Sequence, residues 1–301
     1  MKDAFLIFPP NVMRRAESEI AARFPEIELK PHHTHSEMDE YFSQYFGDPE
    51  QTADLTLTAY PQALWALESA SSLFAEMPPE LPPLRPELAA LGLDQGPAQM
   101  KVIGVVPVVI IHNAGLSDPP GSWEELSKER WWGKVVAPPH DTPLPALFRH
   151  YMEKHFGQAG SAAADALVPE LYPLDINKAV DEGRHQAGLV IPAFGRTFRQ
   201  GQGSMVWPRE GAVAVPIMAF LRKDASPEAR GLLEHLLSVD FQNFLSVDGL
   251  ICPVTPEAQA FPELLENQFR FLWAGWQAAA AVGGGLASKN LRAAKQVLVG
   301  G

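Results

Sequence analysis

Three histidines stand within four positions near the start of the chain, in the segment KPHHTHSEMDEYF at residues 30–42. Neutral imidazole binds metals and accepts hydrogen bonds, so His32, His33 and His35 are candidate metal ligands. A metal site needs three or four converging ligands, and adjacent side chains of an extended segment point to opposite sides. Three interpretations therefore stay open: a metal site, contact with another ligand, or a solvated connection.

The elements around these histidines place them at the edge of a sheet. Residues 26–29 are predicted to form a strand and residues 36–46 a helix, in which Ser36 is followed three residues later by an acidic residue, a helix-start pattern. Ligands of open α/β sheets bind at the carboxyl ends of the strands. His33, His35 and Ser36 are therefore candidate ligand contacts as well.

Two further predicted strands end in side chains that suit a ligand. The strand at residues 4–8 is followed by Asn11, and the strand at residues 53–60 ends in Tyr60. Strands that alternate with helices indicate a parallel sheet, which brings both residues to the edge that carries the histidines. Asn11 can cap the next helix or offer its amide to a ligand, and Tyr60 can pack in the core or stack on a ligand.

Later segments offer groups for an anionic ligand. Asp141 or Thr142 is predicted to cap a helix that has proline at its first position, and the N–H groups of a helix start bind anions. Arg196 follows the strand predicted within residues 187–194, and its guanidinium can clamp a carboxylate or phosphate. Phe194 is a further candidate contact. Capping without a ligand, a surface arginine and core packing are the respective alternatives.

Composition excludes several classes of protein. The 301 residues carry a net charge of −12, which argues against a nucleic-acid binder because such proteins need a basic surface. The single cysteine, Cys252, excludes an internal disulfide and lies in an apolar run typical of a buried thiol. No apolar run is long enough to embed the chain in a membrane. Catalytic and nucleotide-binding motifs are missing, so we predict no enzyme and no cofactor, with a metal ion conceivable only as the ligand.

The first residues, MKDAFLIFPPN, resemble a first β-strand more than a secretory signal. This predicts a cytoplasmic location if the sequence is complete, and a periplasmic one if a leader was removed.

Two long apolar runs contain a proline in the middle. They cover residues 100–113, with Pro107, and residues 205–221, with Pro216. A central strand does not accept proline easily, so we interpret each run as a strand that leaves one sheet and enters another. Two lobes joined by two strands would enclose a cleft that closes on a ligand by hinge motion.

Several helix boundaries are also predicted. Ser122, with a glutamate three residues later, and Ser226, before a proline, mark helix starts. The end of the chain is predicted as two helices at residues 258–281 and 286–298, with the glycine run at 283–285 as the break between them.

The order of several segments resembles a known family. The segments between about residues 50 and 255 include ADLTLTAYP, VIGVVPVVIIHN, PPGSWEELSKERWWGKVVAPP, WPREGAVAVPI and LLSVDFQNFLSVDGLICPV. They are similar to the type II periplasmic solute-binding proteins of ABC transporters, in the branch that contains ferric-ion binders. The resemblance implies an α/β fold of two lobes, with a two-strand hinge and a ligand cleft between them. It implies lobe one at residues 1–106 and 217–301, and lobe two at 107–216.

The chain departs from that family in one respect that concerns the ligand. Ferric-ion binders carry adjacent tyrosines soon after the strand that corresponds to residues 187–194, whereas this chain has no tyrosine after Tyr172. We therefore expect a solute-binding protein that captures a small organic anion or oxyanion, or a metal, with an ABC permease as its expected partner. The alternatives are a cytoplasmic ligand sensor and a metal-binding protein that uses the histidine cluster.

Overall fold

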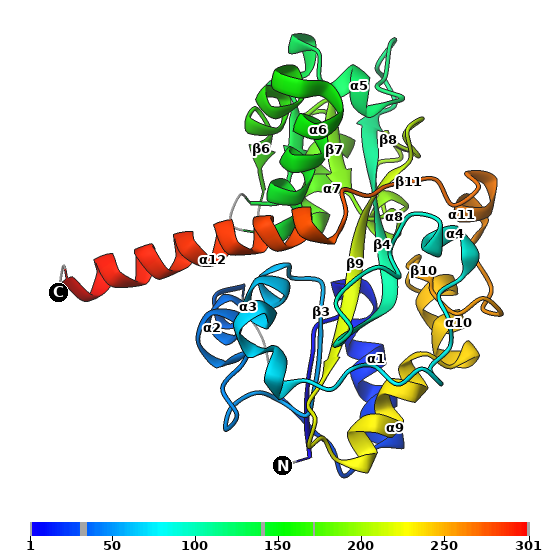
Figure 1. The fold of residues 1–301 in the computed structure, drawn as a ribbon. Helices are drawn as coiled ribbons and strands as arrows, with labels where there is room; N and C mark the ends of the chain where they lie inside the picture. The colour runs from blue at the N-terminus through cyan, green and yellow to red at the C-terminus, as the bar shows by residue number, and fades with distance from the viewer. Residues whose placement is uncertain (1, 31–34, 140–141, 171, 300–301) are drawn as a thin grey trace.

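The computed structural model describes residues 2–30, 35–139, 142–170 and 172–299. Figure 1 shows two α/β lobes, one above the other, joined by the long strands β4 (Met100–Asn113) and β9 (Ala212–Leu221). The N-terminus lies at the base of the lower lobe, which we call lobe one. The predicted two-lobe α/β fold is confirmed.

The sheet of lobe one has the strand order β2-β1-β3-β9-β4. Its three short strands, which are parallel to one another, are β2 (Glu28–Leu29), β1 (Asp3–Leu6) and β3 (Leu55–Thr58). The helical elements in this part of the molecule are α1 (Pro10–Arg23), α2 (His35–Glu40), η1 (Tyr41–Tyr45), α3 (Gln62–Ala70), η2 (Ser71–Leu73), α4 (Pro86–Ala89), α9 (Pro227–Leu236) and α10 (Val239–Val247). Strand β10 (Cys252–Pro253) pairs with β4, and Cys252 is buried as predicted.

The sheet of lobe two continues from β4 through β7 and β5 to β6. The strands that join it are β5 (Val135–Ala137), β6 (Val168–Pro169), β7 (Ala187–Val190) and β8 (Gly203–Val206). The helical elements are α5 (Trp123–Leu126), η3 (Glu129–Trp131), α6 (Pro143–Asp165), α7 (Pro173–Asp181) and α8 (Pro192–Gly195). Residues 192–194, which the sequence suggested as the end of a strand, belong to α8 instead, because Pro192 starts a helix more readily than it continues a sheet.

Two proline-containing strands cross between the sheets as predicted, but the run at residues 205–221 is not one strand: its start belongs to β8, which pairs with β4, and β9 begins at Ala212. Strand β4 pairs with β9 as far as Val108, and with β7 from Val109 onward. Pro107 lies opposite Ala214, and Pro216 lies opposite Val105. The predicted lobe boundaries fall within this paired stretch, and the exact division into lobes stays a prediction.

Serine hydroxyls start several helices, as the sequence indicated. The Ser122 Oγ accepts the N–H of Glu125 at 3.2 Å, and the Ser226 Oγ accepts the N–H of Ala229 at 3.3 Å. Each bond satisfies one of the orphan donors at a helix start. In this respect the local sequence rules describe the structure well.

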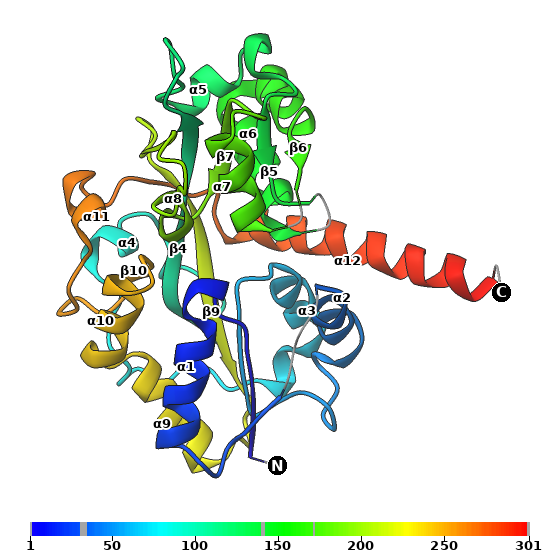
Figure 2. The ribbon, with the colours of Figure 1, turned by 180° about the vertical axis from the view of Figure 1, so that it is seen from behind.

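The glycine run does not break the last helix, so that prediction is wrong. One helix, α12 (Trp276–Val299), passes through all three glycines and leaves the body of the protein beyond α3 (Figures 1 and 2). A Cβ atom on Gly283 would lie 2.1 Å from the Pro61 carbonyl oxygen, and one on Gly284 would lie 2.9 Å from the Trp65 side chain. Gly283 and Gly284 are therefore needed for close packing against Pro61 and α3, which outweighs their low helix propensity.

The segment before α12 also differs from the predicted long helix. It contains the short helix α11 (Pro262–Glu266) and strand β11 (Phe271–Leu272), which pairs with Ala212 and Val213 of β9. Between them, Gln268 and Phe269 both adopt left-handed backbone conformations with φ of 52° and 53°. We call residues 261–276 the strap. The rings of Phe269 and Phe271 in the strap are buried.

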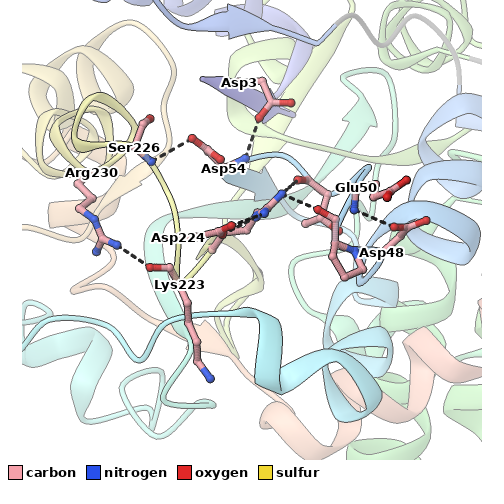
Figure 3. Close-up of polar contacts among 11 residues, drawn as sticks. Asp3, Asp48, Glu50, Asp54, Lys223, Asp224, Ser226 and Arg230 are labelled. Carbon is pink, nitrogen blue, oxygen red and sulfur yellow. Dashed lines mark hydrogen bonds and ion pairs between the residues drawn. The ribbon is translucent and has the colours of Figure 1, made fainter. Parts of the chain in front are cut away.

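A polar network holds the amino ends of the lobe-one strands (Figure 3). The buried Asp3 carboxylate accepts the N–H of Asp54 at 2.9 Å and forms an ion pair with Lys30 at 2.8 Å. The buried Asp54 carboxylate in turn accepts the N–H of Ser226, at the start of α9, at 3.0 Å. Arg222 lies in the same region and binds Asp224 through two nitrogens, at 2.9 and 2.6 Å. This edge is therefore built from groups that satisfy one another.

Candidate functional site

Strand directions place the carboxyl ends of the two sheets opposite each other. Strand β4 runs from lobe one into lobe two, β9 is antiparallel to β4, and β3 is antiparallel to β9, so β3 points toward lobe two. Strand β7 is antiparallel to β4 and therefore points toward lobe one. Strands β1 and β2 share the direction of β3, and β5 shares that of β7.

We call the segments that follow these strands the facing edges. They consist of residues 9–11 and 59–61 in lobe one, and of Pro138, Pro139, Thr142 and residues 191–196 in lobe two. In both views of the fold, α1 and α3 start below this region, and α7 and α8 lie above it (Figures 1 and 2). Five sequence-predicted site residues of the described chain belong to these segments: Asn11, Tyr60, Thr142, Phe194 and Arg196.

Asn11 does not cap α1, so that part of the prediction is wrong. The helix begins at Pro10 with Pro9 before it, because proline fixes the backbone angle that a helix start needs. The Asn11 Nδ2 instead donates to the Gly249 carbonyl at 3.0 Å, which ties α1 to the end of α10. Its Oδ1 is buried without a hydrogen-bond partner among the described residues. A buried unpaired acceptor is costly, and a ligand donor would relieve that cost.

Tyr60 is more a packing residue than an exposed platform. Its side chain is buried, and its ring stacks on Phe42 with the centroids 6.0 Å apart. Its backbone N–H donates to the Thr58 Oγ1 at 2.9 Å, which shapes the turn into α3. Tyr60 therefore lies at the facing edge of lobe one, where its ring packs against Phe42. Direct contact between Tyr60 and a ligand stays a prediction.

The histidine cluster falls largely outside the described residues. His32 and His33 precede α2, which begins at His35, and the side chains of His35 and Ser36 also lie outside the described part of the chain. The helix start itself agrees with the prediction. Within residues 2–30, 35–139, 142–170 and 172–299, no three His, Cys, Asp or Glu side chains gather as a metal site would require. The metal-site prediction for this cluster is therefore untested.

Thr142 stands at the start of α6 as predicted, but its hydroxyl does not cap the helix. It donates to the Pro139 carbonyl at 2.7 Å instead. Pro143 and Pro145 lack N–H groups, so this helix start offers fewer donors to an anion than the sequence argument assumed. Asp141, the other predicted capping residue, lies outside the described residues. Thr142 itself is buried.

Arg196 ends the α8 turn at the carboxyl edge of β7, and its side chain is 46% exposed. The turn is held from behind by Asn177 of α7, which is buried and whose Nδ2 donates to the Phe194 carbonyl and, at 2.8 Å, to the Thr197 Oγ1. Phe194 is 9% exposed and packs in the core. The arginine is therefore a charged group on a rigid support.

Sequence reasoning missed the partner of this arginine. The Arg196 guanidinium donates to the Glu263 carboxylate of α11, which is 67 residues away in the chain. Glu263 falls within what was predicted as a long helix, where a glutamate carries no special signal. Only the path of the strap brings the two residues together.

Two cavities lie away from the facing edges. One, of about 380 Å³, runs along α7 and is lined by residues that include Asp175, Lys178 and Arg199. The other, of about 340 Å³, lies between α3 and α12 beside Leu67 and Trp276. Of the predicted ligand contacts that the structure describes, none lines either cavity.

Comparison with known protein families identifies the family of this two-lobe chain. Residues 50–282 match the family described as bacterial extracellular solute-binding protein. The chain belongs to this family. The match covers most of the chain and includes both crossing strands and the strap. No curated protein sequence is similar enough to this solute-binding protein to count as a match.

Solved structures of similar fold are described as ferric-ion-binding proteins. The apo ferric ion-binding protein A of Pasteurella haemolytica shares 13% identity at a TM-score of 0.74, over 97% of both chains. Iron-bound HitA from Pseudomonas aeruginosa shares 17% identity at 0.72, over 96% of this chain and 98% of HitA. IdiA (FutA) of Trichodesmium, in complex with iron and citrate, shares 16% at 0.66, over 98% of both chains. At these identities the likeness shows the fold alone.

Family and fold together agree on the class of protein. The family is one of solute binders, and the similar structures are of binding proteins, not of enzymes. Family membership also implies a small-molecule or ion ligand and an ABC transporter as partner. Among the described helices, none combines the length and apolar character that crossing a bilayer requires.

Proposed function

We propose that this solute-binding protein captures a small organic anion or oxyanion between its facing edges and delivers it to an ABC permease. The observation that carries the proposal is the position of Arg196, an exposed guanidinium on a rigid turn at the lobe-two edge. Guanidinium groups bind carboxylate and phosphate through two parallel hydrogen bonds. Asn11, across the hinge, supplies an unpaired amide oxygen for a hydroxyl or protonated group of the same ligand.

The absence of tyrosine supports an anion over a bare ferric ion. The chain has no tyrosine after Tyr172, so the α8 turn offers an arginine and a phenylalanine in place of phenolate oxygens. A positive side chain repels a metal cation and attracts the anion that accompanies it. One similar structure holds iron together with citrate, so a carboxylate-bearing ligand is a reasonable first probe.

The proposed mechanism is hinge closure without a catalytic step. Strands β4 and β9 cross between the lobes side by side, and rotation about them brings the facing edge of lobe one toward that of lobe two. The ligand favours the closed state only by the difference in its affinity for the two states. We place the division of the lobes where the predicted boundaries lie, at residues 106/107 and 216/217.

A thermal-shift screen tests this proposal. Citrate, phosphate, zinc ion and ferric citrate are added separately to the purified protein. A ligand present at 100 times its dissociation constant should stabilise the fold by about 2.7 kcal/mol. We expect stabilisation by citrate or phosphate and its loss in an Arg196→Gln variant. Stabilisation by zinc alone, unchanged in that variant, would contradict the anion proposal.

A metal bound by His32, His33 and His35 is the second candidate. It is favoured by the sequence order, in which the cluster follows β2, a strand that runs parallel to β1 as β3 does. The variant in which all three histidines are replaced by alanine decides between the two. If zinc stabilises the protein and this variant loses the effect, the cluster is the site and the metal proposal takes precedence.

A further inference from the structure

The ion pair between Arg196 and Glu263 links two parts of the chain that are otherwise held by different lobes. Arg196 belongs to the α8 turn of lobe two, and Glu263 belongs to α11 in the strap. The pair therefore occupies the guanidinium that the proposed function assigns to the ligand. In the ligand-free protein this arginine already has a carboxylate partner.

The strap is attached on both sides of the hinge. On the lobe-one side, the Arg85 guanidinium lies over the Phe269 ring at 4.8 Å. On the lobe-two side, the Arg270 carbonyl accepts the Ala212 N–H and the Trp207 Nε1–H, both at 3.1 Å. The strap is thus a third connection between the lobes, in addition to β4 and β9.

The geometry of the pair makes it a weak and exchangeable contact. Only the Oε1 of Glu263 is bonded to Arg196, while its Oε2 is buried without a partner among the described residues. A carboxylate that uses both of its oxygens on a guanidinium is the stronger partner, and a buried unpaired oxygen weakens the existing contact. An incoming carboxylate would therefore be a better partner for Arg196 than Glu263 is.

The strap also contains backbone strain next to the pair. Gln268 and Phe269 are consecutive non-glycine residues in the left-handed region, a conformation that costs free energy and persists only where the surroundings hold it. The Phe269 ring is held under Arg85, whereas α11 has Arg196 as its polar tie to the α8 turn. Release of that tie would loosen α11 and leave the far end of the strap in place.

We propose that Glu263 is a built-in competitor for Arg196, and that the physiological ligand carries a carboxylate group which displaces it. This inference rests on the proposed function, since it requires that Arg196 meets the ligand. In the ligand-free state the pair holds α11 against the α8 turn. Ligand binding exchanges an internal carboxylate for an external one and frees α11 from lobe two.

The first experiment needs no ligand. Amide hydrogen exchange is measured for residues 264–270, whose N–H groups bond within the α11 turn, in wild type and in Glu263→Gln, Arg196→Gln and the double variant. Because a partly exposed ion pair is worth little, we expect exchange about two- to five-fold faster in each single variant. The double variant should exchange no faster than either one, since both changes remove the same contact.

Two matched controls accompany these variants. Glu266→Gln removes the same charge from the same helix, at an exposed side chain with no bonded partner in the described part of the chain. Arg199→Gln is the control for Arg196→Gln, because it removes a positive charge three residues further along the chain. Neither control should change the exchange of residues 264–270. Unchanged exchange in Glu263→Gln, or an equal change in Glu266→Gln, overturns the role of the pair as a tie.

The second experiment measures the dissociation constant for citrate by calorimetry. Glu263→Gln should bind citrate about two- to five-fold more tightly than wild type, because the competing state is removed. Equal affinities of Glu263→Gln and wild type overturn the competition. If neither binds citrate, the carboxylate assignment and the proposed citrate-like ligand fail together, while the exchange result still decides whether the pair is a tie.

Discussion

The two edges of the lobe-one sheet use the same kinds of side chain in opposite ways. At the amino edge, Asp3 and Asp54 are buried, and their carboxylates accept the backbone N–H groups of Asp54 and Ser226 (Figure 3). At the carboxyl edge, the amide oxygen of Asn11 is buried and has no partner among the described residues. The carboxylates at the amino edge are hydrogen-bonded within the fold, whereas the amide oxygen at the carboxyl edge is not.

This difference separates structural polar residues from candidate ligand contacts better than residue type does. A buried polar group that is satisfied by its neighbours stabilises the fold and has nothing left to offer a ligand. A buried acceptor without a donor costs stability unless something else binds it. The comparison predicts that changes at the amino edge lower stability, and that changes at the carboxyl edge mainly lower ligand affinity.

The largest expected effect concerns the packing that borders the carboxyl edge. Gly283→Ala places a Cβ atom 2.1 Å from the Pro61 carbonyl oxygen, so α12 and α3 must separate. We expect a loss of about 3 kcal/mol in the free energy of unfolding, measured with urea. Gly285→Ala is the control, because nothing lies within 4 Å of its added Cβ. That variant should be stabilised by about 1 kcal/mol through helix propensity.

A loss in Gly283→Ala no larger than in Gly285→Ala would show that α12 does not pack against Pro61 as described. The carboxyl edge would then have a different border from the one inferred.

The amino edge should give the next largest effect. Asp54→Ala leaves the half-buried N–H of Ser226 without its acceptor, so the free energy of unfolding should fall by about 2 kcal/mol. Ligand affinity, measured by calorimetry on the folded variant, should not change. Asp48→Ala is the matched control: its carboxylate accepts the Glu50 N–H at 2.8 Å in an exposed turn, where water can replace it, and the loss should be less than about 1 kcal/mol. Weaker ligand binding in Asp54→Ala would contradict the inference that the amino edge is structural and only the carboxyl edge contacts the ligand.

Asn11→Ala tests the other side of the comparison. It removes the bond from Nδ2 to the Gly249 carbonyl, which should cost about 1 kcal/mol of stability, and it also removes the unpaired oxygen, which offsets part of that loss. The dissociation constant of the ligand should rise about tenfold, equivalent to about 1.4 kcal/mol. A variant that loses stability but keeps its ligand affinity would make Asn11 a structural residue like Asp54.

The smallest effect is a pH dependence that serves as a control for binding experiments. Burial lowers the pKa of His235, assisted by Arg23 and opposed by Glu19, while the ring packs against Phe24 and Phe241. A lowered folded-state pKa means that the unfolded chain binds the proton more readily. Stability is therefore full above the ordinary histidine pKa of about 6.5 and falls as the pH drops below it.

Replacing this histidine should flatten that pH dependence. His235→Asn should reduce the slope of the free energy of unfolding between pH 6.5 and pH 5, measured by urea titration at each pH. An unchanged slope would assign the dependence to other groups. In the His235→Asn variant, ligand affinities measured between pH 5 and pH 6.5 can then be compared without allowing for protonation of this side chain.

Much of the fold followed from local sequence rules. The prolines Pro107 and Pro216 marked the two crossing strands, and Ser122 and Ser226 marked helix starts that the structure confirms. These features depend on neighbours in the sequence, or on backbone chemistry that each residue carries with it. The same rules correctly directed Asn11, Tyr60, Thr142 and Arg196 to the facing edges.

Most of the remaining failures have a common physical origin in long-range contacts. The glycine run at residues 283–285 was taken for a helix break because its actual role, close approach to Pro61, depends on a residue more than 200 positions away. Asn11 was expected to cap α1, but its amide donates to Gly249. The pairing of Arg196 with Glu263 needs the strap to cross the hinge. No local pattern encodes these partners.

The most direct test of the account is an amide-exchange footprint of the bound ligand. Wild-type protein is compared with and without saturating citrate, and protection is mapped along the chain. We predict slower exchange at the amides of Asn11, Tyr60, Thr142 and Arg196, on both facing edges, with no change at Asp54 and Ser226. Protection confined to the amino edge, or to the cavity along α7, would contradict the central claim that the ligand binds between the facing edges.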